Sequence, residues 1–160
     1  MNREEYISLV KSSEKGIRRF LTALCCGDTQ LADDIAQDAF VKAYLAMDSC
    51  KDSQKFRSWI FRIAYNTFLN QRRSQHVFSD YDDALNMMAE TRSDDTFKYQ
   101  ALYQALAKIP SHERTTILLF YMEGYSAKEI SQTLEISQEA VRQQLSRGRV
   151  HLRNILQTAN

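Results

Sequence analysis

The sequence has few residues that break regular secondary structure. Its 160 residues include only four glycines and one proline, so few tight turns are obligatory. This scarcity argues against a β-sandwich, a collagen-like repeat or low-complexity disorder. It favours helices joined by short loops, and the expected fold class is all-α with two small helical domains.

Long apolar runs are also missing. No stretch approaches the roughly 20 apolar residues that span a bilayer, and the first five residues offer no apolar signal-peptide core. We therefore expect a cytoplasmic protein without membrane insertion. The three cysteines, Cys25, Cys26 and Cys50, lack the spacing of a zinc site or a redox pair, so reduced structural thiols are expected.

Signatures of catalysis are absent too. The sequence has no Gly-rich phosphate loop and no His-Glu-x-x-His motif, and His76, His112 and His151 lie far apart along it. It predicts no catalytic residue, no metal and no cofactor. An enzyme is therefore the competing class that the sequence disfavours.

The net charge of +1 hides an uneven distribution. Basic residues outnumber acidic ones by three in residues 1–75 and by two in residues 106–160, whereas residues 76–105 carry a net charge of −4. Helical periodicity is also lost within this acidic stretch. We therefore expect one domain over residues 1–75, an acidic flexible linker over 76–96 and a second domain over 97–160.

One helix of the first domain has two contrasting faces. It is expected from about Gln30 to Met47, with Asp28 or Thr29 as its cap. Its apolar face carries Ile35, Ala36, Ala39, Phe40, Ala43 and Met47, and its opposite face carries Asp33, Asp34, Gln37, Asp38 and Val41. Solvation alone explains an acidic face, but carboxylates beside an exposed valine also suit a docking patch for a basic partner. Composition does not decide between the two.

The next predicted helix, residues 55–73, combines a core face with a mixed polar surface. Its core face carries Phe56, Ile60, Ile63 and Thr67. The remaining side chains are cations, aromatics and amides: Arg57, Trp59, Arg62, Tyr65, Asn66, Asn70, Arg72 and Arg73. Aromatic rings and guanidinium groups stack on unpaired bases while cations hold phosphates, so the mixture indicates a single-stranded DNA surface. A merely basic, partly buried helix is the alternative.

The second domain begins with two predicted helices. The first covers residues 97–109 and ends at Pro110, with an inward stripe of Leu102, Ala105, Leu106 and Ile109. The second runs from Ser111, its expected cap, to Met122, and Gly124 stops it.

The last two predicted helices form a helix-turn-helix. Ser126 and Glu129 make a capping box for a short helix with Ile130 and Leu134 inward, and Ser137 can cap the final helix. The inner stripe of that final helix is Val141, Leu145, Gly148, Leu152 and Leu156, and its outer surface holds Arg142, Gln143, Ser146, Arg147, Arg149 and Arg153. The second helix of such a motif fits the major groove, so duplex DNA binding is predicted. A packed, solvated helical hairpin is the alternative.

Three segments together resemble the extracytoplasmic-function group of bacterial sigma-70 factors. Residues 32–44 are similar to the polymerase-binding helix of the sigma-2 domain, and residues 56–66 are similar to its promoter-melting segment. Ile109-Pro110 with Arg114, Gly124 to Ile130 and Val141 to Arg149 are similar to the sigma-4 domain. The resemblance implies a dissociable subunit of RNA polymerase that binds the core enzyme and directs promoter-specific initiation without catalysing a reaction. It also implies a separate anti-sigma factor as regulatory partner.

The resemblance further implies a role for each surface. The residues that would dock on the coiled coil of the largest polymerase subunit are Asp34, Gln37, Asp38 and Val41. The residues that would open the minus-ten element are Trp59, Arg62 and Asn66, with Asn66 contacting an extruded base, and the minus-ten DNA surface also includes Asn70, Arg72 and Arg73. The residues that would read the minus-thirty-five element are Arg142, Gln143, Ser146 and Arg147, while Arg149 and Arg153 are assigned only to phosphates. Acidic residues 80–95 would thread near the RNA exit path.

Base preference does not follow from the resemblance. Gln143 and Gln144 occupy positions that are often Ser, Thr or basic in the family. Two further classes stay open beside the sigma factor. A dimeric helix-turn-helix regulator of duplex DNA would leave the first domain unexplained. A helical adaptor that binds only proteins would be indifferent to charge reversal of Arg142 and Arg147.

Overall fold

The computed structural model describes residues 1–74 and 99–158, and none of these residues lies in a strand. The all-α prediction is therefore confirmed. The predicted linker, residues 76–96, and the acidic residues assigned to the RNA exit path lie outside the described residues. No helix within the described ranges is long and apolar enough to cross a membrane.

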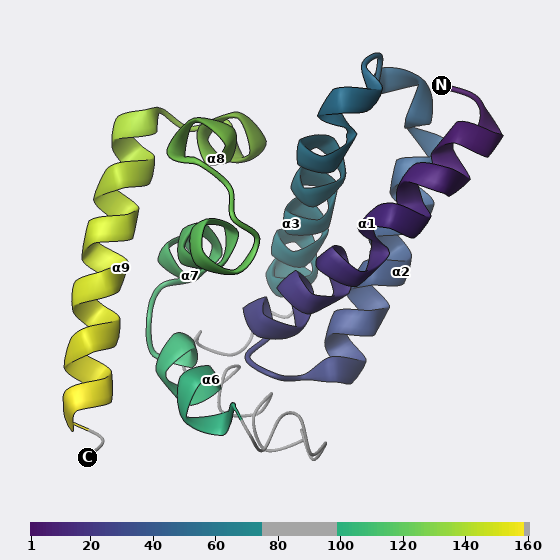
Figure 1. Ribbon diagram of the computed structural model, residues 1–160. Coiled ribbons are helices and arrows are strands. Elements are labelled where there is room, and N and C mark those ends of the chain that lie inside the picture. The colour runs from purple at the N-terminus through teal and green to yellow at the C-terminus, as the bar shows by residue number, and fades with distance from the viewer. Residues whose placement is uncertain (75–98, 159–160) are drawn as a thin grey trace.

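Over residues 1–74, three α-helices build the N-terminal domain (Figure 1): α1 (Arg3–Leu24), α2 (Thr29–Leu45) and α3 (Phe56–Ser74). Helix α2 begins where the sequence predicted, because the carboxylate of Asp28 accepts a hydrogen bond of 3.0 Å from the backbone N–H of Leu31. It ends slightly early, and two short 3₁₀ turns, η1 (Met47–Ser49) and η2 (Ser53–Lys55), lead into α3.

The N-terminal core is built around small residues on α2. The buried face of this helix is rich in alanine, which lets α1 and α3 approach closely, and consists of Ala32, Ile35, Ala36, Ala39 and Ala43. On α3, three of the four predicted core residues are buried, but Ile63 is only half-buried. Phe61 is buried instead, because its ring packs against Tyr125 of the C-terminal helices at a centroid distance of 5.5 Å.

The described part of the C-terminal domain consists of four helices and one π-helical turn: α6 (Gln100–Ala107), α7 (Ser111–Ile117), η3 (Leu118–Met122), α8 (Ala127–Leu134) and α9 (Gln138–Thr158). The prediction that Ser111 caps α7 is wrong. Ser111 is the first helical residue, Pro110 occupies the cap position, and no side chain bonds to that end of the helix. Leu102 and Leu156 are 41% and 39% exposed rather than inward, because both lie near helix ends at the rim of the core.

Helices α8 and α9 form the predicted helix-turn-helix. Ser126 and Glu129 make the capping box of α8, and the hydroxyl of Ser137 accepts a hydrogen bond of 3.0 Å from the N–H of Ala140. Gly148 faces Ile117 of α7 so closely that a Cβ atom would overlap its side chain, and any larger residue would require that side chain to shift. Glu135, in the turn, has φ of +58°, which is uncommon for a residue with a side chain.

The two domains pack against each other. Helix α8 contacts α3, while η3 and α7 contact α1, and the buried residues form one continuous apolar cluster. Arg114 of α7 is almost fully buried at this junction and donates hydrogen bonds to the carbonyls of Leu24, Leu106 and Ile109 at 2.7, 2.9 and 3.3 Å. Its charge sits against the C-terminal ends of α1 and α6, where a helix dipole favours a cation.

Candidate nucleic-acid interface

The outward face of α2 is acidic with an apolar centre. Asp34, Gln37, Asp38 and Val41 are all exposed, and 58% of Val41 is accessible to solvent. Lys42 ion-pairs with Asp38 at 3.3 Å. Asp33 is the acid of this helix that pairs with another helix, because its carboxylate forms an ion pair of 2.9 Å with Arg18 of α1. The structure thus gathers the four predicted docking residues on one free face.

Sequence reasoning missed the apolar extension of this face. Leu45 is 79% exposed and Tyr44 is 42% exposed, directly beyond Val41 on the same helix. Their spacing of three and four residues from Val41 was the available signal, since such residues are neighbours on a helix surface. The docking face therefore has a larger apolar area than was predicted.

The predicted minus-ten residues form a stripe along α3. Trp59, Arg62, Asn66 and Asn70 follow one another at intervals of three or four residues, which brings them to one side of the helix. The indole of Trp59 packs on the ring of Phe56 at a centroid distance of 5.6 Å, and both asparagines are exposed. Arg62 forms an ion pair with Glu135 in the turn of the helix-turn-helix.

Arg72 and Arg73 lie in the last turn of α3. The guanidinium of Arg72 stands over the ring of Phe68, at 5.5 Å from its centroid, and Arg73 is exposed. Arg73 continues the stripe beyond Asn70, because it follows Asn70 by three residues, whereas Arg72 is half-buried over Phe68 on another side of the helix. An aromatic ring, two amides and the guanidinium groups of Arg62 and Arg73 therefore share one side of α3, and the structure does not bring Arg72 to it.

Two other members of the predicted mixture face the C-terminal domain instead. The guanidinium of Arg57 lies 4.4 Å from the ring centroid of Tyr125 and donates a hydrogen bond of 2.7 Å to the carbonyl of Glu123. Tyr65 is half-buried near Thr115, and burial raises the pKa of its hydroxyl. Arg57 and Tyr65 therefore belong to the domain contact, whereas Asn66 and Asn70 face solvent and Arg62 pairs with Glu135 of the C-terminal domain.

The outer surface of α9 is accessible along most of the helix. Its exposed polar side chains include all six predicted residues, Arg142, Gln143, Ser146, Arg147, Arg149 and Arg153. Arg149 stands apart from the others, because it donates hydrogen bonds to the hydroxyl of Tyr121 at 3.0 Å and to the carbonyl of Leu145. It is thereby held against η3.

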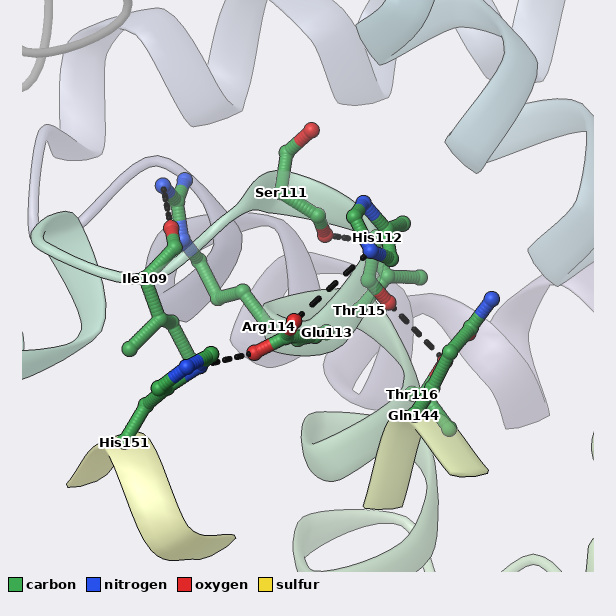
Figure 2. Close-up of polar contacts among 9 residues, drawn as sticks. All are labelled: Ile109, Ser111, His112, Glu113, Arg114, Thr115, Thr116, Gln144 and His151. Carbon is green, nitrogen blue, oxygen red and sulfur yellow. Dashed lines mark hydrogen bonds and ion pairs between the residues drawn. The ribbon is translucent and has the colours of Figure 1, made fainter. Parts of the chain in front are cut away.

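Polar contacts from α7 fix the rotation of α9 (Figure 2). The buried carboxylate of Glu113 lies 2.6 Å from Nδ1 of His151 and 3.8 Å from Nε2 of His112. The hydroxyl of Thr116 donates a hydrogen bond of 2.6 Å to Oε1 of Gln144. The two histidines, distant in the sequence, thus meet at one carboxylate, a proximity that the sequence did not indicate. Gln144 is turned inward, whereas Gln143 is left on the outer surface.

Comparison with known proteins matches both domains. A model described as Sigma-70 region 2 matches residues 9–77, and one described as Sigma-70, region 4 matches residues 99–152. The ECF RNA polymerase sigma factor SigW of Bacillus subtilis is 31% identical over 145 residues, which is 81% of this chain and 78% of the relative. This chain belongs to the extracytoplasmic-function group of the sigma-70 family. The sigma factor binds core RNA polymerase and directs promoter-specific initiation of transcription.

Other known proteins share its sequence or fold. The RNA polymerase sigma-H factor of Pseudomonas aeruginosa is 27% identical over 150 residues, covering 81% of the sigma factor described here and 75% of the relative. The sigma factor RpoE of Bartonella quintana, solved in complex with the anti-sigma factor NepR, has a TM-score of 0.76 and 20% identity over 98% of this chain and 99% of its own. CnrH, solved with the cytosolic domain of CnrY, has a TM-score of 0.76 and 24% identity over 99% and 92% of the two chains. These two likenesses support the fold.

Proposed function

We propose that this sigma factor distributes its task over three surfaces on two domains. Residues 1–75 form the domain that docks on the polymerase and opens the minus-ten element. Residues 97–160 form the domain that reads the minus-thirty-five element, and residues 76–96 are a flexible acidic linker. The observation that carries the proposal is the presence, on one chain, of an exposed acidic docking face, a stacking stripe of exposed and half-buried side chains, and a basic recognition helix.

The docking face of α2 is suited to a basic partner with an apolar contact at its centre. Asp34, Gln37 and Asp38 supply the polar rim, while Val41 and Leu45 supply an apolar area that is costly to leave in water. Complementary charge steers such an encounter and fixes its register. The partner assigned to this face is the coiled coil of the largest polymerase subunit.

The stripe on α3 is suited to a melted strand. Trp59 offers a ring for stacking, Asn66 an amide for a base edge, and Arg62 and Arg73 cations for phosphates, with Asn70 between them. A cavity of about 610 Å³ lies beside the stripe, between α3 and the η1–η2 connection, and Trp59 and Arg62 line it. Extruding a base costs a few kcal/mol, which stacking and pocket contacts offset. Asn66 is assigned to the extruded base.

The outer surface of α9 is suited to the major groove. Arg142, Gln143, Ser146 and Arg147 occupy the first half of the helix, the part that contacts base edges in a helix-turn-helix. Arg149 and Arg153 are assigned to phosphates, and the tether from Tyr121 to Arg149 supports a positioning contact over base reading. The protein itself has no catalytic residue and requires no cofactor in this scheme.

A separate anti-sigma factor is the proposed regulator. The neighbours RpoE and CnrH were each solved with a second protein, described for RpoE as an anti-sigma factor. The sigma factor is proposed to act in the cytoplasm, where polymerase and chromosome meet, and to leave the polymerase after RNA synthesis begins.

Run-off transcription tests the proposed function directly. Core polymerase transcribes fragmented bacterial DNA with and without the protein, and the new transcript starts are sequenced. Discrete new starts that share two spaced upstream elements are expected. Tight duplex binding without any new start would favour a dimeric helix-turn-helix regulator instead, and charge reversal of Arg142 and Arg147 without effect would favour a protein-only adaptor.

A further inference from the structure

A cavity of about 380 Å³ lies between α1, the start of α3 and the end of η3, apart from the three surfaces described above. Its volume falls within the range of about 300–1,000 Å³ that is usual for small-molecule sites. Its wall carries three cations and three hydroxyl groups, which belong to Lys15, Arg19, Arg57, Ser12, Ser13 and Ser53. The cavity therefore offers hydrogen-bond donors from two sides, with α1 on one side and η2 and α3 on the other.

The charge of this cavity is positive. Among the residues that line it, Glu123 supplies the one carboxylate, so three cations leave a net charge of +2. The side chain of Glu123 is only 1% exposed, and Arg19 binds it with two hydrogen bonds of 3.0 and 2.8 Å, whereas 54% of the Arg19 side chain is accessible to solvent. A ligand that enters the cavity therefore meets cations before it meets the carboxylate.

Two of the three cations are already held in place. Arg19 is fixed by Glu123, and Arg57 donates a hydrogen bond of 2.7 Å to the carbonyl of Glu123 and lies over the ring of Tyr125. Lys15 differs from both, because it is exposed and has no ion-pair partner among the residues that the structure describes. Fixed guanidinium groups reduce the entropy that a ligand loses on binding, and the lysine is free to close on it.

The lining favours phosphate groups with concentrated charge. Guanidinium and ammonium donors suit phosphate oxygens. A nucleic-acid strand carries one charge per phosphate and spreads these charges along its length, whereas the cations of this cavity converge from α1 and α3 on one small volume. The rings of Phe56 and Phe61 also line the cavity, but they are 1% and 2% exposed and leave little surface on which a base could stack. The phosphate group itself is therefore what this cavity is built to recognise.

We propose that this cavity binds a small anion that carries a diphosphate group. Lys15, Arg19 and Arg57 bind its oxygens, and the serine hydroxyls of α1 and η2 donate further hydrogen bonds to it. None of the three cations belongs to the docking face, the stripe or the outer surface of α9. The proposal therefore does not rest on the roles assigned to those surfaces, and it stands or falls by a separate experiment.

Lys15→Ala tests the site, because this exposed side chain can be removed without disturbing the core. Lys11→Ala is the matched control: it removes the same charge one turn earlier on α1, from a residue that does not line the cavity. The full chain is titrated with pyrophosphate by calorimetry in about 0.15 M salt, which screens attraction to exposed charges. We expect one pyrophosphate per chain and a Kd about tenfold higher for Lys15→Ala, the loss expected for one charged hydrogen bond. Lys11→Ala should match the unaltered chain, and circular dichroism should show equal helix content in all three.

Two further ligands identify the source of the phosphate. ADP is expected to bind with the same Kd as pyrophosphate if the diphosphate alone is recognised, and more tightly if the natural ligand is a nucleotide. An oligothymidylate is the third ligand, because Gln54 lines both this cavity and the one beside the stripe. Its displacement of pyrophosphate would overturn the proposal in favour of an extended nucleic-acid surface.

Amide NMR spectra locate the bound pyrophosphate. The largest shifts are expected at Lys15, Ser53 and Gln54, which come from the two sides of the cavity. Shifts confined to the arginines of α9 would place the anion on the recognition helix and overturn the proposal. So would equal loss of affinity in the two lysine variants, which would indicate diffuse attraction to α1, or the absence of saturation by about 10 mM pyrophosphate.

Discussion

The guanidinium of Arg114 donates a hydrogen bond of 2.7 Å to the backbone carbonyl of Leu24, so a cation of α7 closes the C-terminal end of α1. Replacing Arg114 by Met keeps much of the side-chain volume but leaves three carbonyls without this donor. Hydrogen bonds to a charged group contribute about 1.5–3 kcal/mol each, so the free energy of unfolding should fall by about 3 kcal/mol or more. Urea unfolding followed by circular dichroism measures the change. If the free energy of unfolding fell by less than about 1 kcal/mol, water would have to replace the guanidinium as the hydrogen-bond donor to these carbonyls.

The sequence was sufficient to predict features that a single helix displays by itself. The two faces of α2 follow from its own periodicity, and the cap at Asp28 lies next to the residues that it stabilises. The capping box at Ser126 and the basic outer surface of α9 are local in the same way. Each of these predictions required only the spacing of residues along one helix.

Contacts between distant segments could not be predicted in this way. Arg57 and Arg62 are both cations of α3 and lie five residues apart. Arg57 nevertheless stacks on the ring of Tyr125, whereas Arg62 forms an ion pair with Glu135. Their different surroundings come from the packing of the C-terminal domain, for which α3 carries no periodic signal. The meeting of His151 with Glu113 depends likewise on how α7 crosses α9. Long-range packing, rather than local propensity, decided these positions.

Gln143 and Gln144 are expected to respond differently to truncation. Gln144→Ala removes one of two partners of the Thr116 hydroxyl, the other being the carbonyl of His112, and should lower the free energy of unfolding by about 0.5–1.5 kcal/mol without changing promoter preference. Gln143→Ala should leave stability unchanged and alter the preferred base at one position of the minus-thirty-five element. Thermal unfolding and a binding screen over single-base promoter variants distinguish the two. The reverse assignment of effects would mean that α9 rotates when it binds DNA.

Charge reversal on α2 should weaken polymerase binding. Asp34→Lys combined with Asp38→Lys places two cations on the docking face, and like charges brought together across an interface cost several kcal/mol, so affinity for core polymerase should fall at least about tenfold. Glu4→Lys with Asp48→Lys is the matched control, because these exposed acids lie outside that face. Fluorescence anisotropy of labelled protein with core polymerase gives both affinities. Equal affinity of both double variants would remove α2 as the docking helix.

Loss of the Asn66 amide should affect promoter melting alone. Asn66→Ala is expected to spare polymerase binding and to reduce open-complex formation two- to tenfold, the range expected for one neutral hydrogen bond. Permanganate footprinting of unpaired thymines measures melting. Gln157→Ala, which removes an exposed amide near the end of α9, serves as the control. Unaltered melting in the Asn66 variant would count against a contact with an extruded base.

Arg142 provides the clearest separation of base reading from phosphate binding. Its side chain is exposed in the first half of α9, and within the part of the chain that the structure describes it donates one long hydrogen bond of 3.4 Å, to Gln138 one turn earlier. A bidentate contact with a guanine would make Arg142→Ala cost about 1–3 kcal/mol on the cognate minus-thirty-five element, with a smaller loss on scrambled DNA. Arg153→Ala, assigned to phosphates, should instead weaken both duplexes alike and reduce the salt dependence of binding. Titrations of both variants on both duplexes at two salt concentrations measure these differences. Equal losses on cognate and scrambled DNA for Arg142→Ala would move this residue to the phosphate contacts, and base reading would then rest on Gln143, Ser146 and Arg147.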